Sequence, residues 1–221
     1  MERFMDLDSE TDGKLYKSHE MAELYCNDCS GCSSCCKKMG KSIVLDPYDI
    51  YMLKKNLNMS FEALLEDKVE LSVCDNLILP NIRLSGDDES CGFLNDTGRC
   101  TIHEFRPGFC RLFPLGRLYN GTDFDYILQT NECAVSERGK VRIDEWLGIS
   151  SLKKYEKFVS VWHYFIRDVG TVIEKSDESV KKNAGVVILK WFYQQMPTDS
   201  DFFTEFYKRY QYIKSVFSME N

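Results

Sequence analysis

The chain has 221 residues, 43% of them hydrophobic and 13% aromatic, which is enough apolar material for a folded globular protein with one main core. Its formal net charge is −7, and this acidic balance argues against a nucleic-acid-binding function, which needs a basic face. No apolar run approaches the roughly 18 to 20 residues that cross a bilayer, so we expect no membrane partner either.

Residues 1–25 are polar and mixed in charge, and we expect an N-terminal extension with one helical stretch, Lys17–Tyr25. The first residues lack the basic start and apolar stretch of a secretory signal, which predicts a cytoplasmic protein. In that compartment clustered cysteines more often bind metal or act in redox chemistry than form disulfides.

The middle of the chain alternates short helices and strand-like stretches. Asp46-Pro47 is typical of the start of a helix that runs to about Asn56, and Ser60 caps a second helix. Residues 69–85 are strand-like, and 115–119 with 124–129 predict a hairpin whose Asn120-Gly121 suits a type I′ turn.

From about Asp144 the pattern becomes helical, with apolar and aromatic residues every three or four positions in three series. The three series are Leu152 to Ile173, Val180 to Phe192, and Phe202 to Phe217. We therefore predict an α+β fold: a loop-rich cysteine module with short strands, residues 26–143, packed on a helical C-terminal region, residues 144–221.

Five cysteines lie within eleven residues, and the first four recur at every third position: Cys26, Cys29, Cys32, Cys35 and Cys36. Cys-x2-Cys-x2-Cys runs hold three corners of a [4Fe–4S] cluster, with the fourth thiolate from elsewhere in the chain. Zinc more often takes two-cysteine knuckles from two distant segments, and it stays the alternative cofactor.

Further cysteines follow in a second region, 86–114, and beyond it. Cys26 and Cys74 are left out of the count, Cys74 because it lies in a strand-like stretch, where a small buried thiol is ordinary. Eight predicted metal ligands then remain: Cys29, Cys32, Cys35, Cys36, Cys91, Cys100, Cys110 and Cys133. Eight thiolates fit two centres of four, or one centre and one labile site, and the count alone does not assign the pairs.

Three other side chains belong to this region. Arg106 and Arg111 flank Cys110, where they would offset the charge of a thiolate cluster and donate hydrogen bonds to it, or form surface ion pairs. His103, in Cys100-x2-His103, is either a nitrogen ligand or a neighbour of the ligands.

The run from Cys29 to Cys36, the Cys91-Gly-Phe-Leu…Gly-Arg-Cys100 segment and Arg106-Pro107-x2-Cys110-Arg111-x-Phe113-Pro114 resemble the CxxCxxCC family of zinc- or iron-chelating proteins. The resemblance covers about residues 26–133 and implies that these cysteines are ligands. A related branch resembles flagellin lysine N-methylases, which couple such a cluster to S-adenosylmethionine chemistry. No glycine-rich nucleotide loop accompanies the cysteines here, so the sequence does not indicate a standard methyltransferase fold.

These patterns lead to one main functional prediction and two alternatives. The main one is a cytosolic iron–sulfur protein acting in electron transfer, redox sensing or an associated modification reaction, with an unknown redox or protein partner. The alternatives are a lysine N-methylase-like enzyme that uses S-adenosylmethionine, and a zinc-stapled interaction module.

Overall fold

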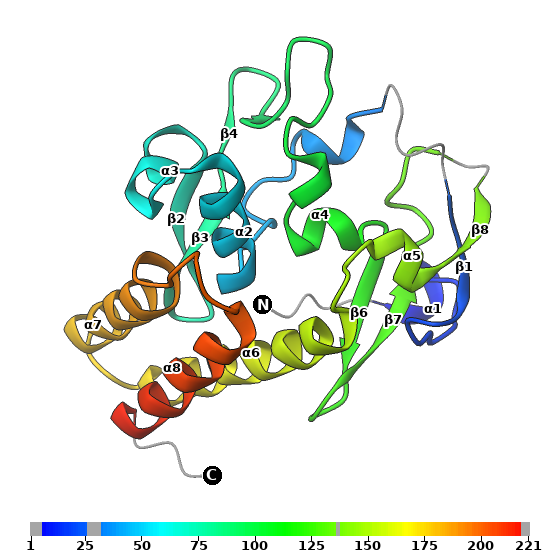
Figure 1. Ribbon diagram of the computed structural model, residues 1–221. Coiled ribbons are helices and arrows are strands. Elements are labelled where there is room, and N and C mark those ends of the chain that lie inside the picture. Colours follow the sequence, from blue (N-terminus) through cyan, green and yellow to red (C-terminus); the bar gives the residue numbers. More distant parts are fainter. Residues whose placement is uncertain (1–5, 26–31, 136–137, 218–221) are drawn as a thin grey trace. The chain divides into compact units, whose positions relative to one another are not determined.

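The computed structural model describes residues 6–25, 32–135 and 138–217 (Figure 1). Its described residues fall into two compact units, each discontinuous in sequence. The helical unit consists of residues 44–83 and 161–217, and the cysteine unit of residues 6–25, 32–43, 84–135 and 138–160. Among the helices of these ranges, none combines the length and apolarity that crossing a bilayer requires.

The first helices of the helical unit begin where the sequence predicts. Helix α2, Pro47–Leu57, starts at a capping box in which Asp46 and Asp49 accept from each other's backbone N–H. Helix α3, Phe61–Asp67, is capped by the Ser60 hydroxyl, which accepts from the backbone of Ala63.

A β-hairpin follows α3 in this unit. Strands β2, Val69–Cys74, and β3, Leu77–Ile82, pair antiparallel from Val69 opposite Ile82 to Cys74 opposite Leu77. The two turn residues, Asp75 and Asn76, both have positive φ, as a type I′ turn demands.

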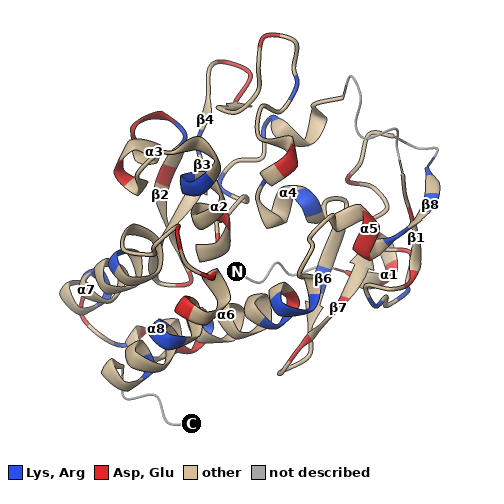
Figure 2. Cartoon of the chain, in the orientation of Figure 1, with Lys and Arg blue, Asp and Glu red and all other residues tan. Residues whose placement is uncertain are grey.

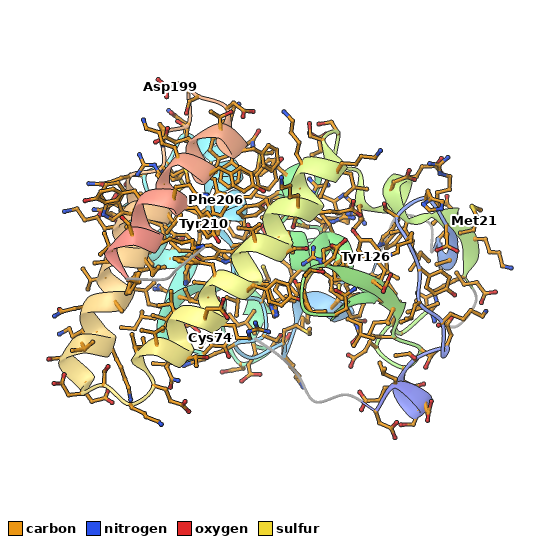
Figure 3. All side chains as sticks on the ribbon, turned by 90° about the horizontal axis from the view of Figure 1, so that it is seen from below. Met21, Cys74, Tyr126, Asp199, Phe206 and Tyr210 are labelled. Atoms are coloured by element: carbon orange, nitrogen blue, oxygen red, sulfur yellow. The ribbon has the colours of Figure 1, made fainter. Side chains whose placement is uncertain are left out.

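The three helical series predicted in the C-terminal half form helices, which contribute buried aromatic side chains to the core of the helical unit. The three helices are α6, Leu152–Ile173, α7, Glu178–Ile188, and α8, Phe202–Val216. A π-helical turn, η4, Leu189–Gln194, follows α7 directly and precedes α8. Phe206 and Tyr210 lie one turn apart on α8 (Figure 3). Their rings lie 6.2 Å from Trp162 and 5.4 Å from Phe165, measured between centroids. Val180 departs from the predicted apolar series, because its side chain is 43% exposed.

The cysteine unit is built from short pieces. Strands β6, Leu115–Tyr119, and β7, Phe124–Leu128, form its longest hairpin, and β4, Leu84–Ser85, pairs with β5, Ser90–Cys91. The unit also contains a third strand pair, described below, and brief helical turns: α1, Leu7–Glu10; η2, Ser34–Cys36; η3, His103–Phe105; α4, Gly108–Leu112; and α5, Ile143–Leu147. The first turns of α6 complete the unit, where Tyr126 on β7 donates to Glu156 at 3.0 Å.

The predicted α+β class with a helical C-terminal region is confirmed. The division of the chain into residues 1–25, 26–143 and 144–221 stays a prediction. The two compact units are each discontinuous in sequence, so they do not test boundaries between consecutive segments.

The helix predicted at Lys17–Tyr25 is wrong. Met21–Tyr25 forms strand β1, which pairs antiparallel with β8, Gly139–Arg142 (Figure 1). Ala22 and Leu24 are buried and their neighbours are exposed, and this alternation suits a strand with one covered face. The distant partner strand, which no local pattern reveals, decides the conformation.

The type I′ turn predicted at Asn120-Gly121 is also wrong, although the hairpin itself is confirmed. Of the two residues only Gly121 has a positive φ, whereas type I′ requires both. The loop is four residues long, and the side chain of Asn120 accepts from the backbone of Thr122 and Asp123. Asn120 therefore acts through an Asx turn.

Candidate metal centre

The predicted ligands that the structure describes all belong to the cysteine unit. They are Cys32, Cys35, Cys36, Cys91, Cys100, Cys110 and Cys133. The eighth predicted ligand, Cys29, lies outside the described residues, as does Cys26. Cys74, which the sequence sets aside, is buried on β2 of the helical unit.

Backbone pairing links the first cysteine segment to the second. Lys37 forms a β-bridge with Ser90, and the N–H of Lys38 donates to the carbonyl of Glu89 at 3.0 Å. Lys37 also pairs with Asp88 through its ammonium at 3.3 Å. Lys37 directly follows Cys36, and Ser90 directly precedes Cys91, so this bridge draws together two ligand segments more than fifty residues apart in sequence.

A compact turn organised by Asn95 connects Cys91 to Cys100. Its side-chain oxygen accepts from the backbone N–H groups of Thr97 and Arg99 and from the Thr97 hydroxyl. Gly98 has a φ of +72°, and a Cβ added there would lie 3.6 Å from the hydroxyl oxygen of Ser33. The turn therefore lies against the first cysteine segment. The sequence analysis missed Asn95, although Asn-Asp-Thr-Gly carries the composition of an Asx turn.

Cys110 lies on α4, after the short turn η3. Arg111, the basic residue of α4 (Figure 2), donates from Nε to the carbonyl of Arg106 at 3.0 Å and from Nη1 to that of Leu147 at 3.1 Å. Its Nη2 donates to the carbonyl of Glu104. All three guanidinium nitrogens of Arg111 thus hold backbone around Cys110.

The electrostatic interactions of the thiols connect five cysteines from both regions. Cys36 interacts with Cys35, Cys91 and Cys110, and Cys100 interacts with Cys35. The hydrogen bond with Cys36 is the main cause that lowers the pKa of Cys35 to about 7, against the opposing effect of burial. The same bond, burial and the neighbouring thiols raise the pKa of Cys36. The hydrogen bond between these adjacent sulfurs therefore favours ionisation of Cys35 over ionisation of Cys36.

Arg106, at the end of η3, is a cation whose charge acts on two of these thiols. Its charge lowers the pKa of both Cys35 and Cys100, although burial, the larger effect, leaves the pKa of Cys100 raised. One guanidinium nitrogen, Nη1, contacts Nε2 of His103. The Nε atom is buried and has no hydrogen-bond partner among the described residues.

Two predicted ligands stand apart from these interactions. Cys32 contacts the hydroxyl of Ser34 at 3.6 Å, and Cys133 lies half-buried in a bend that follows β7. Across residues 6–25, 32–135 and 138–217, no three His, Cys, Asp or Glu side chains converge closely enough to hold a metal ion. The five thiols are thus gathered without forming a finished coordination shell in this part of the chain.

Soft thiolate donors are the ligands that zinc and iron–sulfur clusters select, and a buried N–H without a partner suits an electron-rich group beside it. The chemistry of the residues present therefore fits such a centre.

Comparison with known proteins supports the same chemistry. The model of the CxxCxxCC family, described as "Putative zinc- or iron-chelating domain", matches residues 28–134, a range that holds all eight predicted ligands. The searches of curated proteins and of solved structures returned no match. The cysteine-bearing segment of this chain, residues 28–134, is therefore similar to the CxxCxxCC domain.

Proposed function

We propose that the cysteine unit holds an iron–sulfur cluster of the [4Fe–4S] type, used for electron transfer, redox sensing or an associated modification reaction. One observation carries the proposal: thiols from two sequence regions, Cys35 and Cys36 with Cys91, Cys100 and Cys110, interact electrostatically with one another, and the charge of Arg106 acts on two of them, Cys35 and Cys100. The thiol of Cys35 has a pKa lowered to about 7, and ionising its thiol neighbours as well would bring like charges together unless a metal takes up that charge.

Two features favour iron–sulfur over zinc. A closed structural zinc site uses four ligands, whereas the thiols that interact electrostatically here are five: Cys35, Cys36, Cys91, Cys100 and Cys110. The Cys29-x2-Cys32-x2-Cys35 spacing adds the three-cornered pattern of a cubic cluster. A bound cluster would supply one-electron chemistry, and the chain would supply its ligands, its hydrogen bonds and its burial.

A zinc-stapled module is the second candidate, because the matching family is described as zinc- or iron-chelating. The lysine N-methylase alternative has no supporting observation among the described residues and stays a prediction. We propose that the protein is cytoplasmic. The eight described cysteines are free thiols and form no disulfides, which suits a reducing compartment. The redox or protein partner in this proposal is unknown.

Anaerobic purification followed by analysis of iron, acid-labile sulfide and zinc tests the proposal, with Mössbauer spectroscopy to assign the cluster type. We expect about four iron and four sulfide per cluster. The Cys74→Ser protein is the matched control, because it removes a buried thiol of the helical unit and should bind the same amount of metal. A protein that takes up only zinc after reconstitution with iron and sulfide would refute the iron–sulfur proposal and establish the zinc module.

A further inference from the structure

The two arginines that flank Cys110 differ in the hydrogen-bond donors that they leave unused. Arg111 donates from all three of its nitrogens to carbonyl oxygens. Arg106 gives Nη1 to His103, while its buried Nε–H has no partner within the described residues. Arg111 therefore uses all of its guanidinium nitrogens to hold the backbone, whereas Arg106 keeps one buried donor that is not used within the described residues.

A buried N–H of a cation is costly to leave without an acceptor. Arg106 lies beside the cysteine-bearing helix α4, because Arg111, the neighbour of Cys110, donates to its carbonyl at 3.0 Å. The charge of Arg106 also acts on Cys35 and Cys100, so the acceptors that we infer for its buried Nε–H are sulfurs. Charge-assisted N–H donors stabilise thiolate and sulfide, and donors of this kind tune metal centres.

We propose that Arg106 donates its Nε–H to a sulfur of the bound centre, and that His103 is the positioning residue that fixes the guanidinium for this bond. The neutral imidazole accepts from Nη1 through Nε2, which puts its own proton on Nδ1. Anchored at one end by His103, the guanidinium keeps Nε available to the sulfur. This inference rests on the proposed metal centre and deepens it.

A positive charge and an N–H···S bond stabilise the reduced, more negative state of a cluster, so Arg106 should raise the reduction potential. The test measures the midpoint potential of anaerobically reconstituted full-length protein by spectroelectrochemistry, with iron and sulfide content and circular dichroism as checks of loading and fold. The variants are Arg106→Met and Arg106→Lys, with Arg99→Met as the matched control. Arg99 also places a positive charge near Cys100, but its effect is smaller than that of Arg106.

We expect Arg106→Met to lower the equilibrium constant for reduction about tenfold, which is about 59 mV for one electron. Arg106→Lys, which keeps the charge and loses Nε–H, should lose part of that amount, and Arg99→Met should lose little. His103→Leu should shift the potential in the same direction as Arg106→Met, and His103→Gln, whose amide oxygen accepts a hydrogen bond, should restore it. Equal shifts for Arg106→Met and Arg99→Met, or none for Arg106→Met, would overturn the inference.

A second readout separates this inference from the identity of the metal. If the wild-type protein takes up only zinc, the iron–sulfur proposal fails, and zinc release to an excess of chelator is measured instead. Release about tenfold faster from Arg106→Met than from the wild type or Arg99→Met would support the role of Arg106. Equal release from all three proteins would refute it.

Discussion

Replacing Arg111 by Gln should destabilise the backbone around Cys110 without acting directly on the metal centre. The guanidinium holds the carbonyls of Arg106 and Leu147 at 3.0 and 3.1 Å in partly buried surroundings, and that of Glu104 at an exposed position. Hydrogen bonds to charged groups contribute about 1.5–3 kcal/mol each. Water can replace the exposed bond, and it partly compensates the other two, so we expect a loss of about 3 kcal/mol in the free energy of unfolding.

Urea unfolding of wild type and Arg111→Gln, both loaded with the same metal, measures this loss. Amide hydrogen exchange at residues 104–112 locates it, because those amides should lose protection first. Arg111→Lys is the control, since one ammonium keeps the charge but cannot span three carbonyls, and it should recover only part of the stability.

Two results would refute this reasoning about Arg111. One is a free energy of unfolding within about 0.5 kcal/mol of wild type, the range of ordinary surface substitutions. The other is a shift in reduction potential as large as that of Arg106→Met without any loss of stability. The second result would mean that Arg111 acts directly on the metal centre, which is one of the two roles that the sequence allows for it.

Three further predictions concern the ligands, the helical unit and metal removal. Cys35→Ser should strip metal from the protein while Cys74→Ser should not, and equal loss in metal analysis of the two variants would contradict the ligand assignment. Gly170→Ala should lower the free energy of unfolding by about 1–3 kcal/mol in thermal or urea unfolding, because the added Cβ would lie 2.5 Å from the carbonyl oxygen of Asp75. Unchanged stability would show that the backbone of α6 can shift to accept the Cβ without a loss of stability. Removing the metal with a chelator under anaerobic conditions should abolish the hydrogen-exchange protection of residues 86–114 before the far-UV helical signal falls, because metal binding is coupled to folding in loop-rich metal modules. Full exchange protection of these residues without metal would show that the cysteine module folds without a metal.

Local signals in the sequence were sufficient where a structure depends on neighbouring residues. Helix α2 begins at Asp46 because Pro47 and the capping carboxylates are all within four residues of each other. The aromatic series of α6 and α8 predicts their buried faces, because residues three or four positions apart lie on the same side of a helix and are buried together. At β1 the same reasoning failed, since Met21–Tyr25 pairs with Gly139–Arg142, more than a hundred residues away.

The spacing of the cysteines and the resemblance to a metal-chelating family were readable from the sequence alone, because ligands from one loop must follow one another closely. Which remote cysteines join them was decided by the tertiary structure. The bridge from Lys37 to Ser90 brings Cys91 toward Cys36, and the turn at Gly98 lies against Ser33.

The different roles of Arg106 and Arg111 were likewise invisible in the sequence, where both simply flank Cys110. They differ because the carbonyls that occupy Arg111 include Leu147, a residue that only the fold brings into reach. Hydrogen bonding is directional and short-ranged, so the use of a guanidinium depends on acceptors that sequence distance does not reveal.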